Sequence, residues 1–203
     1  MKRISKEELI LNELNNDNDW DYLSKFGDLS EDIIEEFADK VNWRLISKYK
    51  KLSDDFIIKY QDKLDWILIS KFQNLSDKIV NNCKDKISWE FVSCNKVVSE
   101  DFFEKYFDKI NVSNLCIFVN LSESFIEKHI NDLDLSVVSS NQKLSESFIN
   151  KYADRLDWVY ISHYQKLFEK FILKHKDKVD WYNILTFQKL SKSFEKRYHY
   201  KLN

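Results

Sequence analysis

The segment LSDDFIIKYQDKLDWILISKFQN, residues 52–74, decides the fold, because it recurs along the chain at a fixed period. It aligns without a gap to LSESFINKYADRLDWVYISHYQK, residues 144–166, with 13 of 23 positions identical. The opening residue of the unit returns every 23 residues, as Leu29, Leu52, Leu75, Val98, Leu121, Leu144, Leu167 and Leu190. A fixed period of this length is the signature of a repeat protein. The sequence therefore predicts eight copies of a 23-residue unit and a closing half-copy.

The first half of each copy has the pattern of a short amphipathic helix, which we call helix A. Phe56, Ile57, Tyr60 and Leu64 follow the i, i+3, i+4 spacing that places side chains on one helical face. Ser53 precedes this apolar stripe and is a candidate N-cap. Serine recurs at this position as Ser30, Ser76, Ser99, Ser122 and Ser145. Helix A is therefore expected to begin after a serine in these copies.

The second half of each copy predicts another short helix, helix B. Asp65 is its candidate N-cap, and Trp66, Ile69 and Phe72 follow at a spacing of three, which suits a short helix with some 3₁₀ character. Leucine-rich repeats have a similar period, but they need an LxxLxLxx(N/C)xL strand signature that no copy shows. The predicted fold is all-α, an α-solenoid of eight two-helix repeats with a C-terminal capping helix.

Composition supports a single solenoid domain over residues 1–203. With 1 Gly and no Pro, the chain lacks the usual residues of hairpins and long loops, whereas 43% hydrophobic residues suffice for a continuous core. We expect an N-terminal cap at about residues 1–19, repeats at about 20–189 and a C-terminal cap at about 190–203. Ser5 and Glu8 have the spacing of a capping box in the N-terminal cap.

Charge and cysteine content indicate a soluble cytoplasmic protein. The net charge is -2, so no overall charge draws the chain to nucleic acid or to an anionic membrane. The C-terminal region is basic, because residues 151–203 hold 12 Lys and Arg against 6 Asp and Glu. The 3 cysteines show no CxxC spacing, which suits a reducing compartment. No signal peptide or membrane span is expected.

The unit resembles a tandem 23-residue repeat of the form LSxxFIxKYxDKxDWxxISKYQ, which is found in helical-repeat proteins of giant DNA viruses, phages and AT-rich bacteria. The resemblance extends from Leu29 to the C-terminus. It implies a viral or mobile-element protein that acts inside a host cell. It transfers no catalytic residue to this chain.

No catalytic site, metal, cofactor or small-molecule substrate is expected. Cys83, His129 and His175 occupy one repeat position, but two copies separate each neighbouring pair. Packed helices place such residues about 20 Å apart, whereas zinc ligands lie ~2.0–2.3 Å from one ion. A single glycine, Gly27, excludes a glycine-rich phosphate loop. The chain is therefore predicted to be a non-enzymatic binding protein.

Variation between copies is concentrated in helix B and marks the candidate partner-binding residues. Ligand-facing positions of a repeat protein can differ where architectural positions do not. The same variation would also arise on a solvent-facing edge that carries no function. The candidate residues are Tyr22, Arg44, Glu90, Phe91, Ser113, Asn114, Ser136, Ser140, Asn141, Tyr160, Tyr182 and Asn183. The expected partner is a protein, and the repeat resemblance favours a host defence protein that the chain binds and inhibits.

Two copies lose the tryptophan of helix B and hold Val112 and Leu135 instead. The smaller side chains would produce either a slimmer core with a local change of curvature or a central notch lined by hydroxyl and amide groups. Ser139 would line that notch together with the serines and asparagines named above.

A ladder of basic residues on helix A supports an alternative function, nucleic-acid binding. Its candidate residues are Lys128, Lys151, Lys174, Lys196 and Arg197. Such a ladder could follow a phosphate backbone, with affinity that falls steeply as salt rises. Nearby acids such as Glu127 would cancel part of its field.

Overall fold

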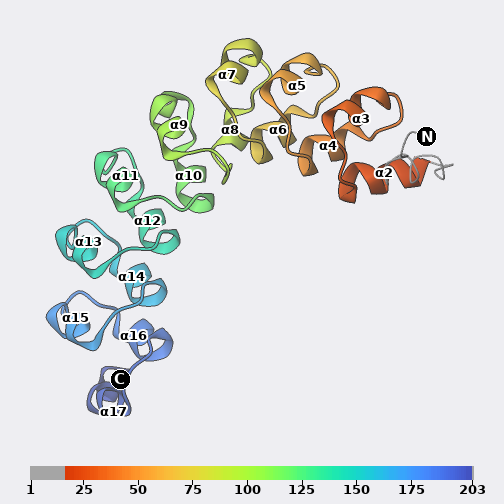
Figure 1. Cartoon of the computed structure of the whole chain (residues 1–203). Coiled ribbons are helices and arrows are strands. Elements are labelled where there is room, and N and C mark those ends of the chain that lie inside the picture. Colours follow the sequence, from red (N-terminus) through yellow and green to blue (C-terminus); the bar gives the residue numbers. More distant parts are fainter. Residues whose placement is uncertain (1–16, 203) are drawn as a thin grey trace. The chain divides into compact units, whose positions relative to one another are not determined.

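A computed structural model describes residues 17–202, and the regular structure in this range is entirely helical (Figure 1). The A helices are α3 (Glu31–Glu36), α5 (Asp54–Lys59), α7 (Asp77–Cys83), α9 (Glu100–Lys105), α11 (Glu123–Lys128), α13 (Glu146–Lys151), α15 (Glu169–Lys174) and α17 (Lys192–Tyr198). The B helices are α2 (Asp17–Phe26), α4 (Trp43–Tyr49), α6 (Trp66–Phe72), α8 (Trp89–Val92), α10 (Val112–Phe118), α12 (Leu135–Asn141), α14 (Trp158–Tyr164) and α16 (Trp181–Phe187). Two 3₁₀ turns are η1 (Phe107–Lys109) and η2 (His199–Leu202). The all-α prediction is confirmed.

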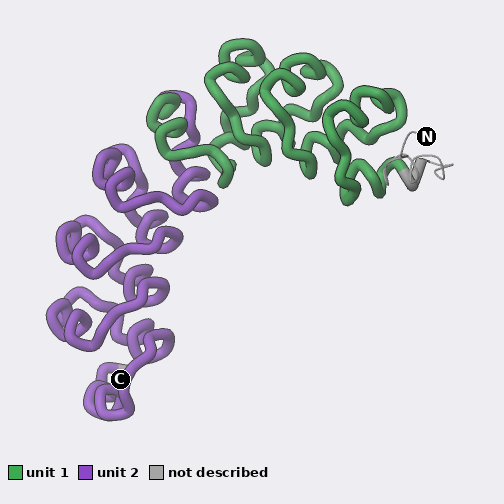
Figure 2. The backbone as a smooth tube through the Cα atoms, viewed as in Figure 1, with its two compact units in different colours: residues 1–107 green, residues 108–203 purple. Residues whose placement is uncertain are grey.

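The chain forms two compact units, residues 1–107 and residues 108–203 (Figure 2). In unit 1, α2, α4, α6 and α8 pack in succession, and α5 packs against α7. In unit 2, α10, α12, α14 and α16 pack in succession, and η2 contacts both α16 and α17. Each of these helices contacts its counterpart one copy along, which is the nearest-neighbour packing of a solenoid. The predicted N-terminal cap, with Ser5 and Glu8, lies outside the described residues except for the start of α2.

The A helices begin where the serines predict. The Ser53 hydroxyl accepts a hydrogen bond from the backbone N–H of Phe56 at 3.2 Å, which satisfies a donor in the first turn of α5. The same serine bond begins six further A helices, after Ser30, Ser76, Ser99, Ser122, Ser145 and Ser191. Helix α15 differs, because its N-cap is Phe168 and no side chain caps it.

The core lies between the two rows of helices. Ile57 of α5 and Ile69 of α6 are both fully buried, and the equivalent side chains of the other described copies are also buried, except for Glu195 in the closing half-copy. Phe72 lies outside this core and retains 36% of its surface. The 3₁₀ character expected of helix B is not observed. Helix α6 is α-helical rather than 3₁₀, since Ile69 bonds back to Asp65 and Gln73 bonds back to Ile69 with i to i−4 spacing.

The tryptophans tie each B helix to the turn before it. The Trp66 Nε1–H donates to the carbonyl of Gln61 at 2.7 Å, and its counterparts at Trp43, Trp158 and Trp181 make the same bond. The copies with Val112 and Leu135 lack this bond, yet α10 and α12 are regular seven-residue helices. The shortened B helix is α8, with four residues. The shortening of α8 was not predicted from the sequence.

Candidate binding surface

A row of buried serines joins successive copies within each unit. The Ser47 hydroxyl donates to the carbonyl of Trp43 at 2.7 Å and accepts from the backbone N–H of Asp65 at 3.0 Å. Ser139 is fully buried and makes the equivalent bonds to Leu135 and Asp157. The prediction that Ser139 lines a central notch is therefore wrong, because its hydroxyl is used inside the fold.

A second row, the glutamine ladder, closes the ends of the B helices and was not identified from the sequence. It consists of Gln73, Gln142, Gln165 and Gln188. The Gln165 amide nitrogen donates to the carbonyls of Ser139 and Gln142 at 2.9 and 2.8 Å, and its oxygen accepts from the N–H of Leu144 at 3.0 Å. Each glutamine thus satisfies two carbonyls of the preceding copy and the first N–H of its own copy. The recurrence of glutamine at a 23-residue spacing was the available signal.

Unit 1 contains two substitutes for this glutamine. Asn95, one position earlier in its copy, donates to the carbonyls of Ser70 and Gln73 at 2.9 and 2.8 Å. Lys50 stands at the glutamine position itself, is buried, and donates from its ammonium group to the carbonyl of Gly27. Burial lowers the pKa of Lys50, because the charged form loses its hydration.

The last residue of most B helices is an exposed aromatic side chain, and we call this set the aromatic edge. Phe26, Tyr49 and Phe72 belong to unit 1, and Phe118, Tyr164 and Phe187 belong to unit 2. Their exposed fractions lie between 36% for Phe72 and 63% for Phe26. The sequence reasoning did not single out this edge, although an aromatic residue recurs at the position in six copies.

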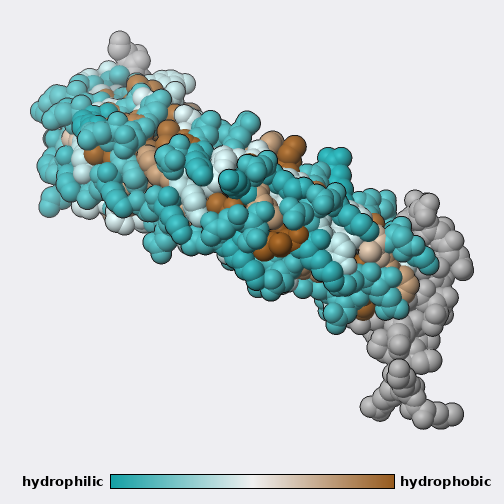
Figure 3. All heavy atoms as spheres, turned by 90° about the horizontal axis from the view of Figure 1, so that it is seen from above, coloured by the Kyte–Doolittle hydropathy of each residue, from teal (hydrophilic) through white to brown (hydrophobic). Residues whose placement is uncertain are grey.

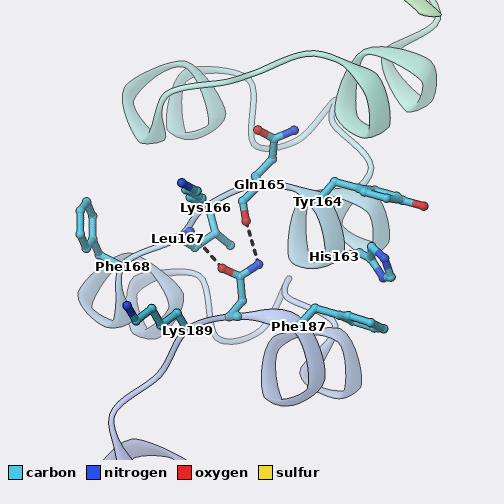
Figure 4. A pocket seen from close by; sticks show the side chains of 9 residues that line it. His163, Tyr164, Gln165, Lys166, Leu167, Phe168, Phe187 and Lys189 are labelled. Atoms are coloured by element: carbon cyan, nitrogen blue, oxygen red, sulfur yellow. Dashed lines mark hydrogen bonds between the residues drawn. The ribbon is translucent and has the colours of Figure 1, made fainter.

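Each unit has a hollow beside its part of the aromatic edge. The hollow in unit 1 measures about 300 Å³ and is lined by Tyr49 and Phe72 among others. The hollow in unit 2 measures about 410 Å³ and lies between Tyr164 and Phe187 on one side and Phe168 on the other (Figure 4). The glutamine ladder forms the floor of both, through Gln73 in unit 1 and Gln188 in unit 2. Equivalent positions of different copies therefore build the same hollow twice.

The rims of the two hollows differ in charge. In unit 1, the Lys48 ammonium group lies 4.9 Å from the ring centre of Tyr49 and 5.5 Å from that of Phe72. In unit 2, the equivalent residue is His163, whose ring centre lies 4.2 Å from that of Tyr164 and 3.9 Å from that of Phe187. The lysine–aromatic contacts of the rim in unit 1 are therefore replaced by packed rings in unit 2.

All predicted partner-binding residues are at least partly exposed. Tyr22, Arg44, Glu90, Ser113, Asn141, Tyr160 and Tyr182 are exposed, and Phe91, Asn114, Ser136, Ser140 and Asn183 are half-buried. The structure brings several of them to the aromatic edge. The ring centres of Tyr160 and Tyr164 are 6.2 Å apart, and Oδ1 of Asn183 lies 3.2 Å from Nδ1 of His163. Ser140 instead bonds to carbonyls of its own helix, and Arg44 lies 3.7 Å from Asp65.

The basic ladder of helix A is exposed but largely engaged with acids and amides. Lys128, Lys151, Lys174, Lys196 and Arg197 all reach solvent. The Lys151 ammonium group lies 2.8 Å from a carboxylate oxygen of Glu127, and this hydrogen bond raises the pKa of Lys151. Lys174 donates to the side chain of Asn150. Carboxylates in the same row reduce the positive field that a phosphate backbone would need.

The cysteines are poor nucleophiles. Burial raises the pKa of Cys116 to about 11, and it also raises the pKa of Cys83 and of Cys94. Within residues 17–202, no group of three or more His, Cys, Asp or Glu side chains is arranged to hold a metal ion.

The hydrophobic residues visible in Figure 3 form separate spots on a largely hydrophilic surface. None of the described helices combines the length and the apolar character needed to cross a membrane. No protein-family model, curated protein or solved structure matches this chain. Inferences about function therefore depend on the surface itself.

Proposed function

We propose that the chain is a non-enzymatic scaffold that binds a partner protein along the ends of its B helices. The observation that carries this proposal is the aromatic edge, whose large rings are exposed in both units. Tyrosine and other aromatic side chains are enriched among the residues that dominate binding energy at protein interfaces. Inhibition of a host defence protein, which the repeat resemblance implies, would be one use of such a scaffold.

The floor beneath the edge supports this proposal. Glutamine side chains donate to carbonyls at the ends of the B helices, so the aromatic side chains project from backbone that these hydrogen bonds hold in place. Side chains that project from a rigid backbone lose less conformational entropy when a partner binds, which favours affinity. Rim residues such as Lys48 and His163 differ between the two hollows while a glutamine is retained beneath each, and a repeat protein can vary its partner through such local differences.

A peptide-display selection on the purified chain tests the proposal. We expect selected peptides to lose at least about 10-fold in affinity when Tyr164 and Phe187 are both changed to alanine, because truncating two hot-spot rings removes more than about 1.4 kcal/mol. The matched control is Lys151→Ala with Lys128→Ala on helix A, which should leave affinity unchanged. Equal binding by both variants, or selective binding of oligonucleotides that weakens steeply with salt, would contradict the proposal.

A further inference from the structure

Phe168 breaks the most regular feature of the helix A starts. The equivalent residue is a serine in seven other copies, where its hydroxyl caps the helix. Phe168 makes no such bond and is 77% exposed. The chain thus loses a favourable cap and leaves a large apolar ring in water, and each change alone disfavours the folded state. The fold gives no reason for this residue, so a contact outside the fold is the remaining use for it.

Two hollows meet at Phe168. One is the hollow of about 410 Å³ in which Phe168 faces Tyr164 and Phe187 across the glutamine floor (Figure 4). The other measures about 640 Å³ and is lined by Phe168, Phe171 and Leu173 among others. The ring therefore stands between two depressions with apolar walls, each large enough to receive apolar side chains of a partner.

Lysines surround this apolar centre. Lys166 and Lys189 line the first hollow, and Lys170 and Lys174 line the second. Among the described residues, none of the four forms an ion pair, although Lys174 donates to Asn150. Figure 4 shows the side chains of Lys166 and Lys189 on the same side of the hollow as Phe168.

The nearby carboxylates are already bound to backbone groups. Glu146, the one acidic residue that lines either hollow, accepts from the N–H of Phe168 at 2.7 Å. Glu169 accepts from the N–H of Ser191 at 2.6 Å. The four lysines outnumber these two carboxylates, so the surface around Phe168 combines apolar walls with a net positive charge, and its electrostatic complement is negative.

We propose that Phe168 and its two hollows dock an acidic polypeptide segment. Apolar side chains of that segment enter the hollows on either side of the Phe168 ring, and its Asp and Glu side chains meet Lys166, Lys170, Lys174 and Lys189. This inference rests on the proposed function and specifies the partner class. A polypeptide suits the site better than a nucleic acid because Phe171 and Leu173 offer apolar walls, whereas nucleotides carry polar sugars and phosphates along one track.

Replacing Phe168 with serine tests this inference, because the variant is expected to be more stable than the wild type and unfolding could not explain a loss of binding. Phe168→Ser restores the cap used by seven other copies, so we expect the melting temperature to rise by roughly 2–4 °C. The probe is a phage library of random 16-residue peptides selected on the wild-type chain. Enriched peptides are expected to carry an excess of Asp and Glu around aromatic or aliphatic residues. Their affinity for Phe168→Ser should fall at least about 10-fold, despite the higher stability of that variant.

A charge-reversal variant separates the acidic partner from other ligands. Lys166→Glu with Lys189→Glu should lower affinity for the same peptides at least about 10-fold, whereas Lys176→Glu, in the turn after α15, should not change it. Peptides without an acidic excess, or peptides that bind Phe168→Ser as well as wild type, would overturn this inference. If those peptides still require Tyr164 and Phe187, the proposed function survives. Failure to enrich any peptide overturns both, as does exclusive binding of a dT30 oligonucleotide.

Discussion

The hollow in unit 1 and the hollow in unit 2 share a glutamine floor and an aromatic pair, Tyr49 with Phe72 and Tyr164 with Phe187, and differ at a few rim residues. Both are closed beneath by a glutamine whose amide bonds to two carbonyls of the preceding copy, Gln73 in one and Gln188 in the other. Above that floor, Lys48 in unit 1 corresponds to His163 in unit 2, and Ser53 corresponds to Phe168. The comparison indicates that the glutamine ladder stabilises the fold, whereas the rim residues can differ between copies and so determine which partner binds.

One difference reaches the floor itself. Gln165 in unit 2 corresponds to Lys50 in unit 1, so an amide with three hydrogen bonds is replaced by a buried ammonium group that donates to the carbonyl of Gly27. A buried charge without a carboxylate partner is costly. Unit 1 is therefore expected to be less stable at this floor position than unit 2.

The largest effect is predicted for the floor of unit 2. Gln165→Leu leaves two carbonyls and one N–H without partners, and we expect the free energy of unfolding to fall by about 3 kcal/mol. Urea denaturation followed by circular dichroism measures this change. The adjacent exposed variant Lys166→Leu is the control and should change stability by less than about 0.5 kcal/mol. A loss below about 1 kcal/mol at Gln165 would show that the ladder is not a stabilising element.

An intermediate effect of opposite sign is predicted at Lys50. Lys50→Gln should restore the ladder bond and raise the free energy of unfolding by about 1 kcal/mol near neutral pH. Because burial lowers the pKa of Lys50 in the folded chain, the unfolded chain binds more protons between that value and the ordinary 10.5. The stability of the wild type therefore rises with pH as pH approaches 10.5.

The Lys50→Gln variant lacks this titration, so its advantage over the wild type should shrink in alkaline solution. Urea denaturation of both proteins at pH 7 and pH 10 measures the difference. An advantage that stays constant or grows between these values would contradict the assignment to a buried ammonium group.

The smallest effect is predicted for the rim of unit 1. Hydrogen bonding and charge from Lys48, with a further contribution from the charge of Lys25, lower the pKa of Tyr49. Lys48→Ala should raise the pKa of Tyr49 toward its ordinary value and leave the unfolding midpoint nearly unchanged, since both groups are exposed. Ultraviolet titration, with Tyr49→Phe as the reference that identifies the signal, measures this shift. An unchanged pKa of Tyr49 would show that Lys48 does not act on its side chain, and the two rims would then not differ in this interaction.

Most of the architecture was accessible from the sequence because its signals are local and repeated. The serines that begin the A helices and the apolar stripe around Ile57 were recognised correctly, since capping and helical spacing are determined by nearby residues. The roles of Ser139 and Gln165 were not, because their partners lie 18 to 26 residues away and the hydrogen bonds form only when copies stack.

The candidate site was accessible only in part. Variation in helix B directed attention to Tyr160 and Tyr182, which are indeed exposed. The aromatic edge was missed because Phe72 repeats as regularly as a core residue, and periodicity alone does not distinguish a buried row from an exposed one. Phe168 was visible as the single non-serine in its row, but its meaning depended on the hollows beside it.

The glutamine ladder also constrains how such a chain can change in length. Each rung joins residues 23 and 26 positions apart in neighbouring copies, and residues 21 positions apart within one copy. A duplication or deletion of 23 residues inside a unit would supply or remove a complete rung and leave its neighbours matched. Any other length would misalign the amides with the carbonyls they hold. Gene rearrangements that preserve the fold should therefore occur in whole multiples of the repeat, and new rims would be acquired one copy at a time.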